Sequence, residues 1–220
     1  MRMRRKKNAQ ARLEACAGYR IGKEEIDLMR EGGRTPLRLE IGCGKGDFAL
    51  EASSRYGEQP YIALEVISDV ALLAMEKAKA ANAGNLKFLI ANAETLPEYF
   101  QKGDVSVIYL NFSDPWPKKG YAKRRLTHRR FLEIYKSILT DDGVICFKTD
   151  NEALFDFSLE EFEAAGFYLS QVTRDLHAEP YAANNILTEY ERNFSEKGSK
   201  IHRLVASLKN QTPDLYGTTL

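Results

Sequence analysis

"LEIGCGKGDF", residues 39–48, joins an apolar run to the start of a helical pattern through three glycines at alternate positions. The apolar run predicts a buried strand, and the polar residue after the last glycine begins a helix. Gly42, Gly44 and Gly46 therefore stand where the backbone must turn tightly and can approach a ligand closely. Glycines also simply end strands, and this is the alternative explanation for the loop taken alone.

Outward from this loop, short apolar runs alternate with helix-like stretches, which is the pattern of an α/β fold. Most of the runs are apolar enough to be buried on both faces of a parallel sheet. We expect strands at 37–41, 61–66, 86–91, 105–110 and 143–149, and helices at 47–57, 68–84, 127–139 and 151–166. Ser68 is expected to cap the second helix, and Gly84 to stop it. Two alternating segments, 167–175 and 200–208, are expected to pair antiparallel at the sheet edge.

The chain length of 220 residues suits one domain with added terminal segments. Residues 1–34 are expected to form a basic, partly helical N-terminal extension, residues 35–208 the compact domain, and residues 209–220 a flexible tail. The basic start "MRMRRKK" is as compatible with a solvated arm as with a polyanion-binding segment.

Composition narrows the class of protein. No apolar run approaches the roughly 20 residues of a membrane helix, and no apolar stretch follows the basic start. The three cysteines, Cys16, Cys43 and Cys146, are too widely spaced to suggest a disulfide framework or a zinc site. We therefore expect a cytoplasmic protein that does not associate with membranes.

Polar residues near the first three strand ends predict a nucleotide-like ligand. Asp47 stands where a dinucleotide fold needs glycine or alanine, which disfavours NAD. Glu65 ends the second strand about 20 residues beyond the loop, where an acid accepts hydrogen bonds from ribose hydroxyls. Asn92 and Ala93 follow the third strand and are placed to meet an adenine edge. Glu40 lies inside the first strand, just before the loop.

This order of an acid, GxGxG and an acid on the second strand resembles the class I S-adenosylmethionine-dependent methyltransferases. The resemblance implies an α/β, Rossmann-like fold: a mostly parallel seven-stranded sheet with an antiparallel edge and helices on both faces. Ligands of open α/β sheets bind beyond the carboxyl ends of the strands. The end of the fourth strand thus becomes the expected reaction site.

That strand end carries "NFSDPWP", residues 111–117, followed by seven cations without an acid until Glu133. Two prolines stiffen the turn around Asp114, so a rigid acid is positioned at the cleft. Trp116 offers a flat face for stacking a base, and the cations that follow can hold phosphates. The alternative is a core tryptophan beside a solvated basic helix face. The combination favours a nucleic-acid base as substrate.

Four segments together, "EIGCGKG", "NFSDPWPKKGYAKRRL", "KTDN" and "TEYERNFSEKGSKIHRL", resemble the bacterial tRNA (guanine-N7-)-methyltransferases over roughly residues 37 to 206. The resemblance implies methyl transfer from S-adenosylmethionine to N7 of a variable-loop guanosine of tRNA (tRNA position 46). The products would be 7-methylguanosine and S-adenosylhomocysteine. It further implies no metal, and a monomer or homodimer.

The resemblance also implies roles for individual residues. Those expected to bind the cofactor are Glu40, Gly42, Gly44, Gly46, Glu65, Asn92, Ala93 and Asp114. Those expected to bind the guanosine are Lys118, Asp150, Thr188, Glu189, Tyr190 and Glu191. Those expected to contact RNA are Gly120, Tyr121, Ala122, Lys123, Arg124 and Arg125. We interpret the Glu191 carboxylate as an acceptor for the N1 and exocyclic amine of the base.

The expected chemistry needs little acid–base help. Guanine N7 carries an in-plane lone pair and no proton, so the site must mainly align two reactants. None of the three histidines belongs to a convincing catalytic set. Because methylation makes the purine cationic, Asp114 is our candidate catalytic residue, as a carboxylate that favours the transition state.

Other functions stay open at this point. The loop after the fourth strand would also suit a methyltransferase that acts on an exocyclic amine of a nucleic-acid base. A non-catalytic RNA chaperone that keeps the cofactor fold is a second alternative. A small-molecule methyltransferase is a third, but it leaves the cations unexplained and predicts weak salt dependence.

Overall fold

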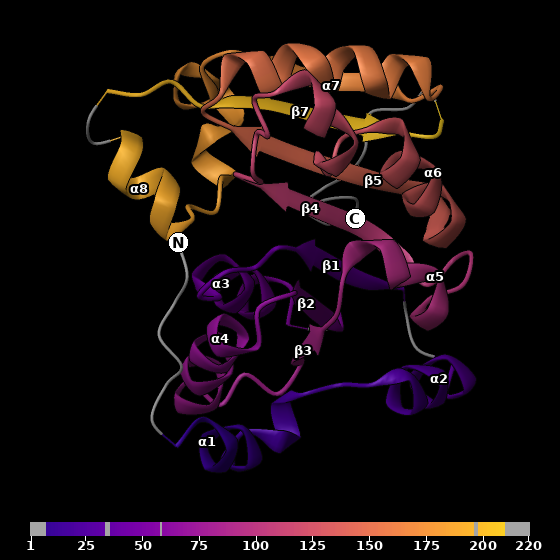
Figure 1. Cartoon of the computed structure of the whole chain (residues 1–220), viewed down its shortest axis with the longest axis vertical. Coiled ribbons are helices and arrows are strands. Elements are labelled where there is room, and N and C mark those ends of the chain that lie inside the picture. Colours follow the sequence, from indigo (N-terminus) through magenta and orange to yellow (C-terminus); the bar gives the residue numbers. More distant parts are fainter. Residues whose placement is uncertain (1–7, 34–35, 58, 196–197, 210–220) are drawn as a thin grey trace.

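A computed structural model of the chain describes residues 8–33, 36–57, 59–195 and 198–209. Seven strands form one sheet in the order β3-β2-β1-β4-β5-β7-β6 (Figure 1). β7 pairs antiparallel with both β5 and β6, and all other pairs are parallel. The strands are β1 (Leu37–Ile41), β2 (Tyr61–Glu65), β3 (Leu86–Ile90), β4 (Val105–Asn111), β5 (Leu139–Thr149), β6 (Tyr168–Thr173) and β7 (His202–Ser207). The predicted mostly parallel sheet with an antiparallel edge is confirmed.

Helices cover both faces of the sheet. One apolar core lies between the sheet and α2, α5, α6 and α7, and the other lies under α1, α3 and α4. Each buried strand feeds both cores because successive side chains point to opposite faces. The helices are α1 (Ala9–Ala15), α2 (Lys23–Glu31), α3 (Asp47–Arg55), α4 (Ser68–Ala80), α5 (Leu96–Tyr99), α6 (Arg129–Ile138), α7 (Glu152–Ala164) and α8 (Glu189–Ser195). Short 3-10 turns are η1 (Ala17–Tyr19), η2 (Ala93–Thr95), η3 (Lys119–Arg124), η4 (Leu176–Ala178) and η5 (Pro180–Asn184).

Helix α4 begins at Ser68, as predicted, but the predicted cap and stop residues are wrong. Ile67, not Ser68, is the N-terminal cap residue, and it makes no side-chain capping bond. The helix ends at Ala80, and Asn82 turns the chain with φ 53°, before Gly84 is reached. Asparagine tolerates this left-handed conformation better than most residues, so it can end a helix as glycine does. Strand β5 also begins earlier than predicted, at Leu139, directly after α6.

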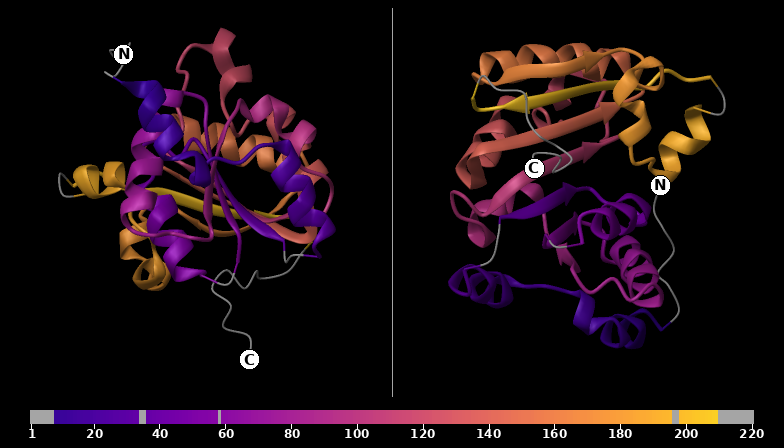
Figure 2. Two further views of the ribbon diagram at one scale, coloured as in Figure 1. Left: turned by 90° about the horizontal axis from the view of Figure 1, so that it is seen from below. Right: turned by 180° about the vertical axis from the view of Figure 1, so that it is seen from behind.

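The N-terminal segment packs along the β3 side of the sheet (Figures 1 and 2). Ile21 and Ile26 are buried in the core that α2 shares with α5 and α6. The Ile21 N–H donates to the Phe88 carbonyl at 3.0 Å, so this segment pairs with part of the β3 edge, which would otherwise be open. The domain boundary at residue 34 stays a prediction. The basic start (residues 1–7) and the predicted tail from residue 210 lie outside the described residues.

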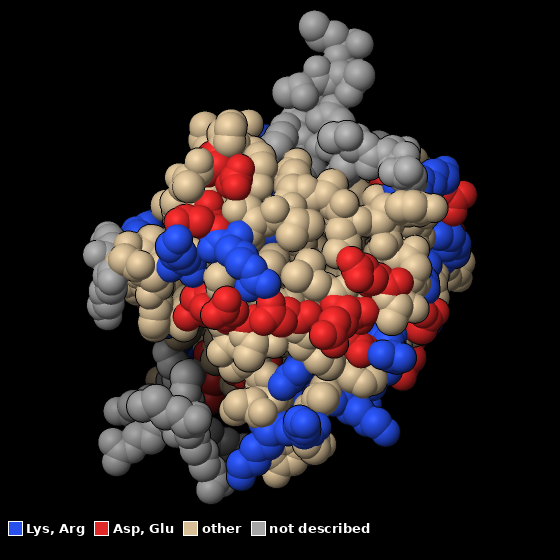
Figure 3. Space-filling model, turned by 90° about the horizontal axis from the view of Figure 1, so that it is seen from above, with Lys and Arg blue, Asp and Glu red and all other residues tan. Residues whose placement is uncertain are grey.

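Exposed acids gather on the molecule's α7 side. Seen from above in Figure 3, acidic side chains form a band across this face. Helix α7 contributes the exposed acids Glu152, Asp156, Glu160 and Glu163. Within the part of the chain that the structure describes, no helix is long and apolar enough to cross a membrane.

Candidate active site

The glycine loop after β1 has the tightly turned backbone that its sequence predicts. Gly42, Gly44 and Gly46 have φ values of 81°, 56° and 80°, in the left-handed region that side chains disfavour. A Cβ atom at Gly46 would lie 2.6 Å from the Ala74 Cβ, so this glycine also lets α3 approach α4. Around Gly42 and Gly44, by contrast, a Cβ would meet open space. The first two glycines thus leave room on the ligand side of the loop.

Glu65 fixes this loop from the neighbouring strand. Its Oε2 accepts the Gly44 N–H at 3.0 Å, and its Oε1 accepts the Ile67 N–H at 3.0 Å. A carboxylate oxygen has more than one acceptor position, so both oxygens keep capacity for a ligand hydroxyl. Glu65 is therefore held in one orientation at the end of β2, as a ribose-binding acid needs to be.

Two adjoining cavities open beyond the carboxyl ends of the strands. The larger, of about 550 Å³, is lined by Glu65, Asn92 and Asp114 among others. The smaller, of about 200 Å³, lies between the glycine loop and the start of α8. The residues that line both cavities are Gly42, Asn111 and Phe112. The larger cavity has the size of small-molecule sites, and together the two form an elongated cleft.

Glu40 places a buried carboxylate in the smaller cavity. It is 1% exposed, and its Oε1 accepts from the Asn111 side-chain amide at 3.1 Å. Within the described residues, Oε2 has no hydrogen-bond partner. Burial raises the pKa of Glu40 to about 7, against the opposing effects of the Asn111 hydrogen bond and of Lys148. A cationic ligand group at this point would satisfy the unpartnered oxygen and favour the ionised form.

Asn92 and Ala93 lie at the far end of the larger cavity. The Asn92 Oδ1 accepts the Glu94 N–H at 3.0 Å and so begins the η2 turn. This contact uses the side-chain oxygen, and the two N–H donors of the Asn92 amide are not part of it. Ala93 is buried beside it. The pair can offer a donor and a backbone group to an adenine edge.

The 111–117 loop after β4 is strained at two aromatic residues. Phe112 and Trp116 have φ values of 50° and 41°, which are uncommon for bulky side chains. The Phe112 N–H donates to the Lys148 carbonyl at 2.9 Å. Arg125 holds the other end of the loop, because its guanidinium donates to the carbonyls of Pro115 at 2.9 Å and Trp116 at 3.1 Å. Asp114, between the two strained residues, is exposed at the larger cavity.

The basic stretch after this loop divides into internal and exposed cations. Arg129 forms an ion pair with Glu161 at 2.8 Å, and Arg130 pairs with Glu94. The Arg124 guanidinium lies over the rings of Trp116 at 4.9 Å and Tyr121 at 4.7 Å. Within the described residues, the exposed Lys118, Lys119 and Lys123 make no ion pair. These three lysines, with Arg124, are the charges directed at solvent beside the cleft.

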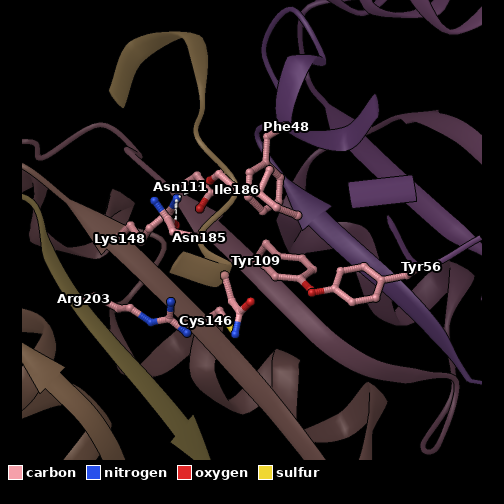
Figure 4. Close-up of a pocket in the computed structure, with 10 residues that line it drawn as sticks. Phe48, Tyr56, Tyr109, Asn111, Cys146, Lys148, Asn185, Ile186 and Arg203 are labelled. Atoms are coloured by element: carbon pink, nitrogen blue, oxygen red, sulfur yellow. Dashed lines mark hydrogen bonds between the residues drawn. The ribbon is translucent and has the colours of Figure 1, made fainter. Parts of the chain in front are cut away.

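A buried polar cluster, which we call the Lys148 hub, ties β5 to the segment between β6 and β7. The Lys148 Nζ lies 2.6 Å from the Glu191 Oε2 and donates to Asn185 Oδ1 at 3.0 Å and the Ile186 carbonyl at 2.9 Å. Glu191 Oε1 accepts from the Asn185 amide at 2.7 Å and lies 3.4 Å from His177 Nε2. Figure 4 shows Lys148 meeting Asn185 beside a small cavity of about 40 Å³. Burial lowers the pKa of Lys148, and the Glu191 carboxylate opposes that shift.

The hub changes how the predicted guanosine-binding residues are interpreted. Glu191 is fully buried, at 0% exposure, and both of its oxygens contact protein groups. Thr188 caps α8, since its Oγ1 accepts the Glu191 N–H at 2.8 Å. Thr188, Glu189 and Tyr190 line the smaller cavity, whereas Glu191 does not. A base could reach the Glu191 carboxylate only after some of these contacts open, so that role stays a prediction.

Tyr190 and Asp150 do lie together. The Tyr190 hydroxyl donates to Asp150 Oδ2 at 3.1 Å, and its ring is stacked on Phe194 with centroids 4.1 Å apart. The Phe112 ring is tilted against Tyr190, with centroids 5.0 Å apart. Glu189 forms an ion pair with Lys45 of the glycine loop at 2.9 Å. The start of α8 is thereby joined to both β1 and β4 loops.

Comparison with known proteins decides the family. A family described as "Putative methyltransferase" matches residues 34–204. A tRNA (guanine-N(7)-)-methyltransferase of Streptococcus agalactiae serotype III (strain NEM316) is 43% identical over 210 residues, covering 94% of this chain and 99% of the relative. One from Staphylococcus haemolyticus (strain JCSC1435) is 48% identical over 171 residues, covering 78% and 79%. The chain belongs to the tRNA (guanine-N(7)-)-methyltransferase family.

Solved structures agree with the fold that this family membership implies. An antibiotic-related methyltransferase superposes with a TM-score of 0.63 at 17% identity, covering 84% of this chain and 93% of that one. The 16S rRNA methyltransferase KamB superposes with a TM-score of 0.60 at 16% identity, covering 84% and 92%. At these identities the likeness concerns the fold alone. The predicted Rossmann-like methyltransferase fold is confirmed.

Three residues that matter to the geometry of this tRNA (guanine-N(7)-)-methyltransferase family member were missed from the sequence. Asn111 orients Glu40, Lys148 organises the hub, and Phe112 lines both cavities. The signals for Asn111 and Lys148 were their positions at the ends of strands β4 and β5, where polar residues interrupt apolar runs. The φ of Phe112 had no sequence signal, because phenylalanine does not favour that conformation.

Proposed function

We propose that the protein transfers the methyl group of S-adenosylmethionine to N7 of a guanosine in tRNA, at the variable-loop position 46. The observation that carries the proposal is the cleft itself: an acid-lined cavity at the glycine loop adjoins a loop followed by exposed cations. Family membership identifies the class of reaction.

The residues at the cleft fit the cofactor. Glu65 would bind the ribose hydroxyls, and Asn92 with Ala93 the adenine. Gly42 and Gly44 have open space where a ligand can approach the backbone. The unpartnered oxygen of Glu40 faces the part of the cleft where a cationic group is needed. When bound, S-adenosylmethionine supplies a methyl group on cationic sulfur, and the C–S electron pair stays on sulfur while the guanine N7 lone pair forms the new bond.

Asp114 serves as the catalytic carboxylate in this proposal. It is exposed at the rim of the larger cavity, on a loop stiffened by Pro115 and Pro117 and fastened by Arg125. No proton leaves N7, so a general base is unnecessary. The purine gains positive charge as the bond forms, and a fixed carboxylate stabilises that charge more in the transition state than in the ground state.

The substrate side of the proposal uses the start of α8 and the segments that follow β4 and β5. Lys118, Asp150 and the stretch 188–191 would hold the guanosine, and residues 120–125 would contact the RNA backbone. Tyr190 and Asp150 are already joined by a hydrogen bond at the smaller cavity. The exposed Lys118, Lys119 and Lys123 suit phosphate contacts. The cytoplasmic location, and the choice between monomer and homodimer, remain predictions.

The test is to incubate the protein with S-adenosylmethionine and unmodified tRNA transcripts, digest the RNA and identify methylated nucleosides by mass spectrometry. We expect 7-methylguanosine, mapped to the variable loop. A transcript with adenosine at that position is the matched control and should stay unmethylated. Methylation of an exocyclic amine instead would overturn the proposal while keeping the fold, and cofactor binding without any methylation would favour a non-catalytic RNA-binding role.

A further inference from the structure

We propose that Phe112 is a positioning residue whose ring stacks on the target base and holds it at the reaction point of the cleft. This inference rests on the proposed function. It assigns to Phe112 a role that neither the family resemblance nor the expected cation contacts supply. Three features of Phe112 point to this role: its backbone, its place between the cavities and the surroundings of its ring.

The backbone of Phe112 is the first observation. A φ of 50° is disfavoured for a bulky L-residue, whereas glycine adopts it without penalty. The conformation is enforced by the Phe112 N–H bond to the Lys148 carbonyl at 2.9 Å. Strained residues of this kind persist where surrounding contacts over-determine them, and they cluster at ligand-binding sites. Glycine would make the same turn without strain, so the turn itself does not explain why position 112 carries an aromatic ring.

The place of Phe112 is the second observation. Gly42, Asn111 and Phe112 line both cavities, so they mark the junction between the adenosine end and the glycine-loop end of the cleft. The sulfur of the cofactor is bonded to both its adenosyl and its methionine parts, so the reaction point belongs at this junction. Gly42 has no side chain there, and the Asn111 amide is bonded to Glu40. Phe112 is the one of the three that presents a flat apolar surface.

The surroundings of the ring are the third observation. Phe112 is half-buried, with Tyr190 tilted against it at a centroid distance of 5.0 Å and the Lys148 Nζ 5.9 Å from its centroid. Trp116, the other candidate for stacking, has a comparable pair of neighbours, Tyr121 at 5.9 Å and the Arg124 guanidinium at 4.9 Å. The two rings differ in place, because Trp116 lines only the larger cavity and leads into the basic stretch. Trp116 therefore belongs to the RNA-facing arm, and Phe112 to the base pocket.

The chemistry of the substrate explains why such a ring is needed. An enzyme that modifies a base within folded RNA must take that base out of its stack. A flat aromatic surface replaces part of the lost stacking, and it accepts the base before any carboxylate is engaged. An aliphatic side chain of similar volume would fill the space but would not provide this face.

The experiment compares Phe112→Leu, Phe112→Tyr and the wild type, with Tyr168→Leu as matched control. Tyr168 is an exposed aromatic residue on β6, outside both cavities. Trp116 is the only tryptophan of the chain, so its fluorescence reports ligand binding at the cleft without turnover. We would measure the Kd of S-adenosylhomocysteine, the Kd of tRNA in its presence, and kcat/KM for methylation.

We expect Phe112→Leu to weaken tRNA binding and lower kcat/KM by about five- to a hundred-fold, the range that stacking of one base on one ring supplies. The Kd of S-adenosylhomocysteine should change by less than about three-fold, and Phe112→Tyr and Tyr168→Leu should behave like the wild type. Wild-type tRNA affinity and turnover in Phe112→Leu would overturn the inference. Equal loss of cofactor binding would also overturn it, since Phe112 would then be a wall of the cofactor site. Lack of 7-methylguanosine with the wild type would instead contradict the proposed function.

Discussion

Asp114 differs in exposure from Glu40 and Glu65, the other two acids proposed to bind the cofactor. Glu40 and Glu65 are buried at strand ends, whereas Asp114 stands on the rim of the larger cavity, between two strained aromatic residues. A carboxylate in such a position interacts weakly with a neutral base and more strongly with a cationic one.

Replacing Asp114 with asparagine should therefore lower kcat by about ten- to a hundred-fold, since one aimed charge is lost at constant shape. The measurement is single-turnover methylation at saturating cofactor and tRNA, together with both Kd values. Asp141→Asn removes an exposed acid that pairs with Lys102 at the surface, and it should leave the rate unchanged. An Asp114→Asn protein with the wild-type rate, while binding both ligands, would remove Asp114 from the mechanism.

Glu40 gives the protein a pH-dependent stability. Burial raises its folded pKa from 4.5 to about 7. Below pH 4.5 the group is protonated in both states and contributes nothing. Between pH 4.5 and 7 the folded protein binds the proton more tightly, so stability falls as pH rises through this window, by about 3 kcal/mol in total.

Glu40→Gln should remove that dependence. We expect its free energy of unfolding, relative to the wild type without cofactor, to increase by about 3 kcal/mol between pH 5 and pH 7.5. Urea unfolding at the two pH values measures this difference. Adding S-adenosylmethionine should shrink it, because a cationic ligand favours the ionised wild-type carboxylate. Parallel stabilities of the two proteins across this range would contradict the assignment.

At the residue scale, the sequence predicts which side chains gather at the cleft better than it predicts whether each one is buried or paired. Gly42, Glu65 and Asn92 lie at one cleft because the carboxyl ends of parallel strands share one edge of the sheet. The burial of Glu191 could not be predicted, since its partners Lys148 and Asn185 come from distant segments. Likewise, cations of the same basic stretch differ in role: Arg129 pairs with Glu161, whereas the exposed Lys123 makes no ion pair with any residue that the structure describes.

At the element scale, the segment between β6 and β7 is held by a buried ion pair in addition to buried apolar residues such as Leu176 and Ile186. The turns η4 and η5 and helix α8 meet the sheet at the Lys148 hub, where an ammonium group and a carboxylate satisfy each other. Removing one partner of a buried pair leaves an uncompensated charge, which costs far more than the pair contributes.

Lys148→Met should consequently destabilise the protein by about 3–5 kcal/mol. The double variant Lys148→Met, Glu191→Leu should recover most of that lost stability, because an apolar pair replaces the ionic one. If Glu191 or the position of α8 is needed to bind the base, the double variant should nevertheless be inactive. Thermal unfolding and methylation assays measure the two effects. Lys102→Met, which breaks an exposed pair with Asp141, should change stability by less than about 0.5 kcal/mol. An active double variant would show that the hub acts only in folding.

Element identity was predictable because apolar periodicity is strong in buried strands. β1 was predicted with its observed ends, and β2 and β3 within one residue. Helix ends were predicted less accurately than strand ends. In α4, Asn82 takes the left-handed turn that Gly84 was expected to supply. The packing of Ile21 and Ile26 into the core was also missed, since the hydrophobic signal of this segment is interrupted by charged residues.

At the scale of the whole molecule, charge is unevenly distributed. Acidic side chains form a band on the α7 side, with Lys and Arg beside it (Figure 3). The arm after the 111–117 loop carries the exposed cations Lys118, Lys119, Lys123 and Arg124. The net charge of +1 conceals this arrangement. A polyanion should be repelled from one face and attracted to the other, which orients tRNA before any specific contact forms.

The double variant Lys119→Ala, Lys123→Ala tests whether the exposed lysines after the 111–117 loop attract tRNA. Each phosphate contact contributes about 0.7–0.9 to the slope of log K against log salt, so the slope should become shallower by about 1.4–1.8. Filter binding of tRNA between low and moderate salt measures it. Lys102→Met again provides the control and should leave the slope as in the wild type. An unchanged slope in the double variant would place the RNA contacts elsewhere.

The strained aromatic residues of the 111–117 loop have a consequence for engineering. At positions 112 and 116, glycine or asparagine fits the backbone better than the native ring does. If a library of variants at positions 112 and 116 is selected for thermostability alone, it should therefore become enriched in glycine and asparagine. These substitutions remove the aromatic rings that face the substrate. Selection for thermostability therefore has to be combined with selection for methylated RNA in every round. Without it, the selected variants are expected to be stable but inactive.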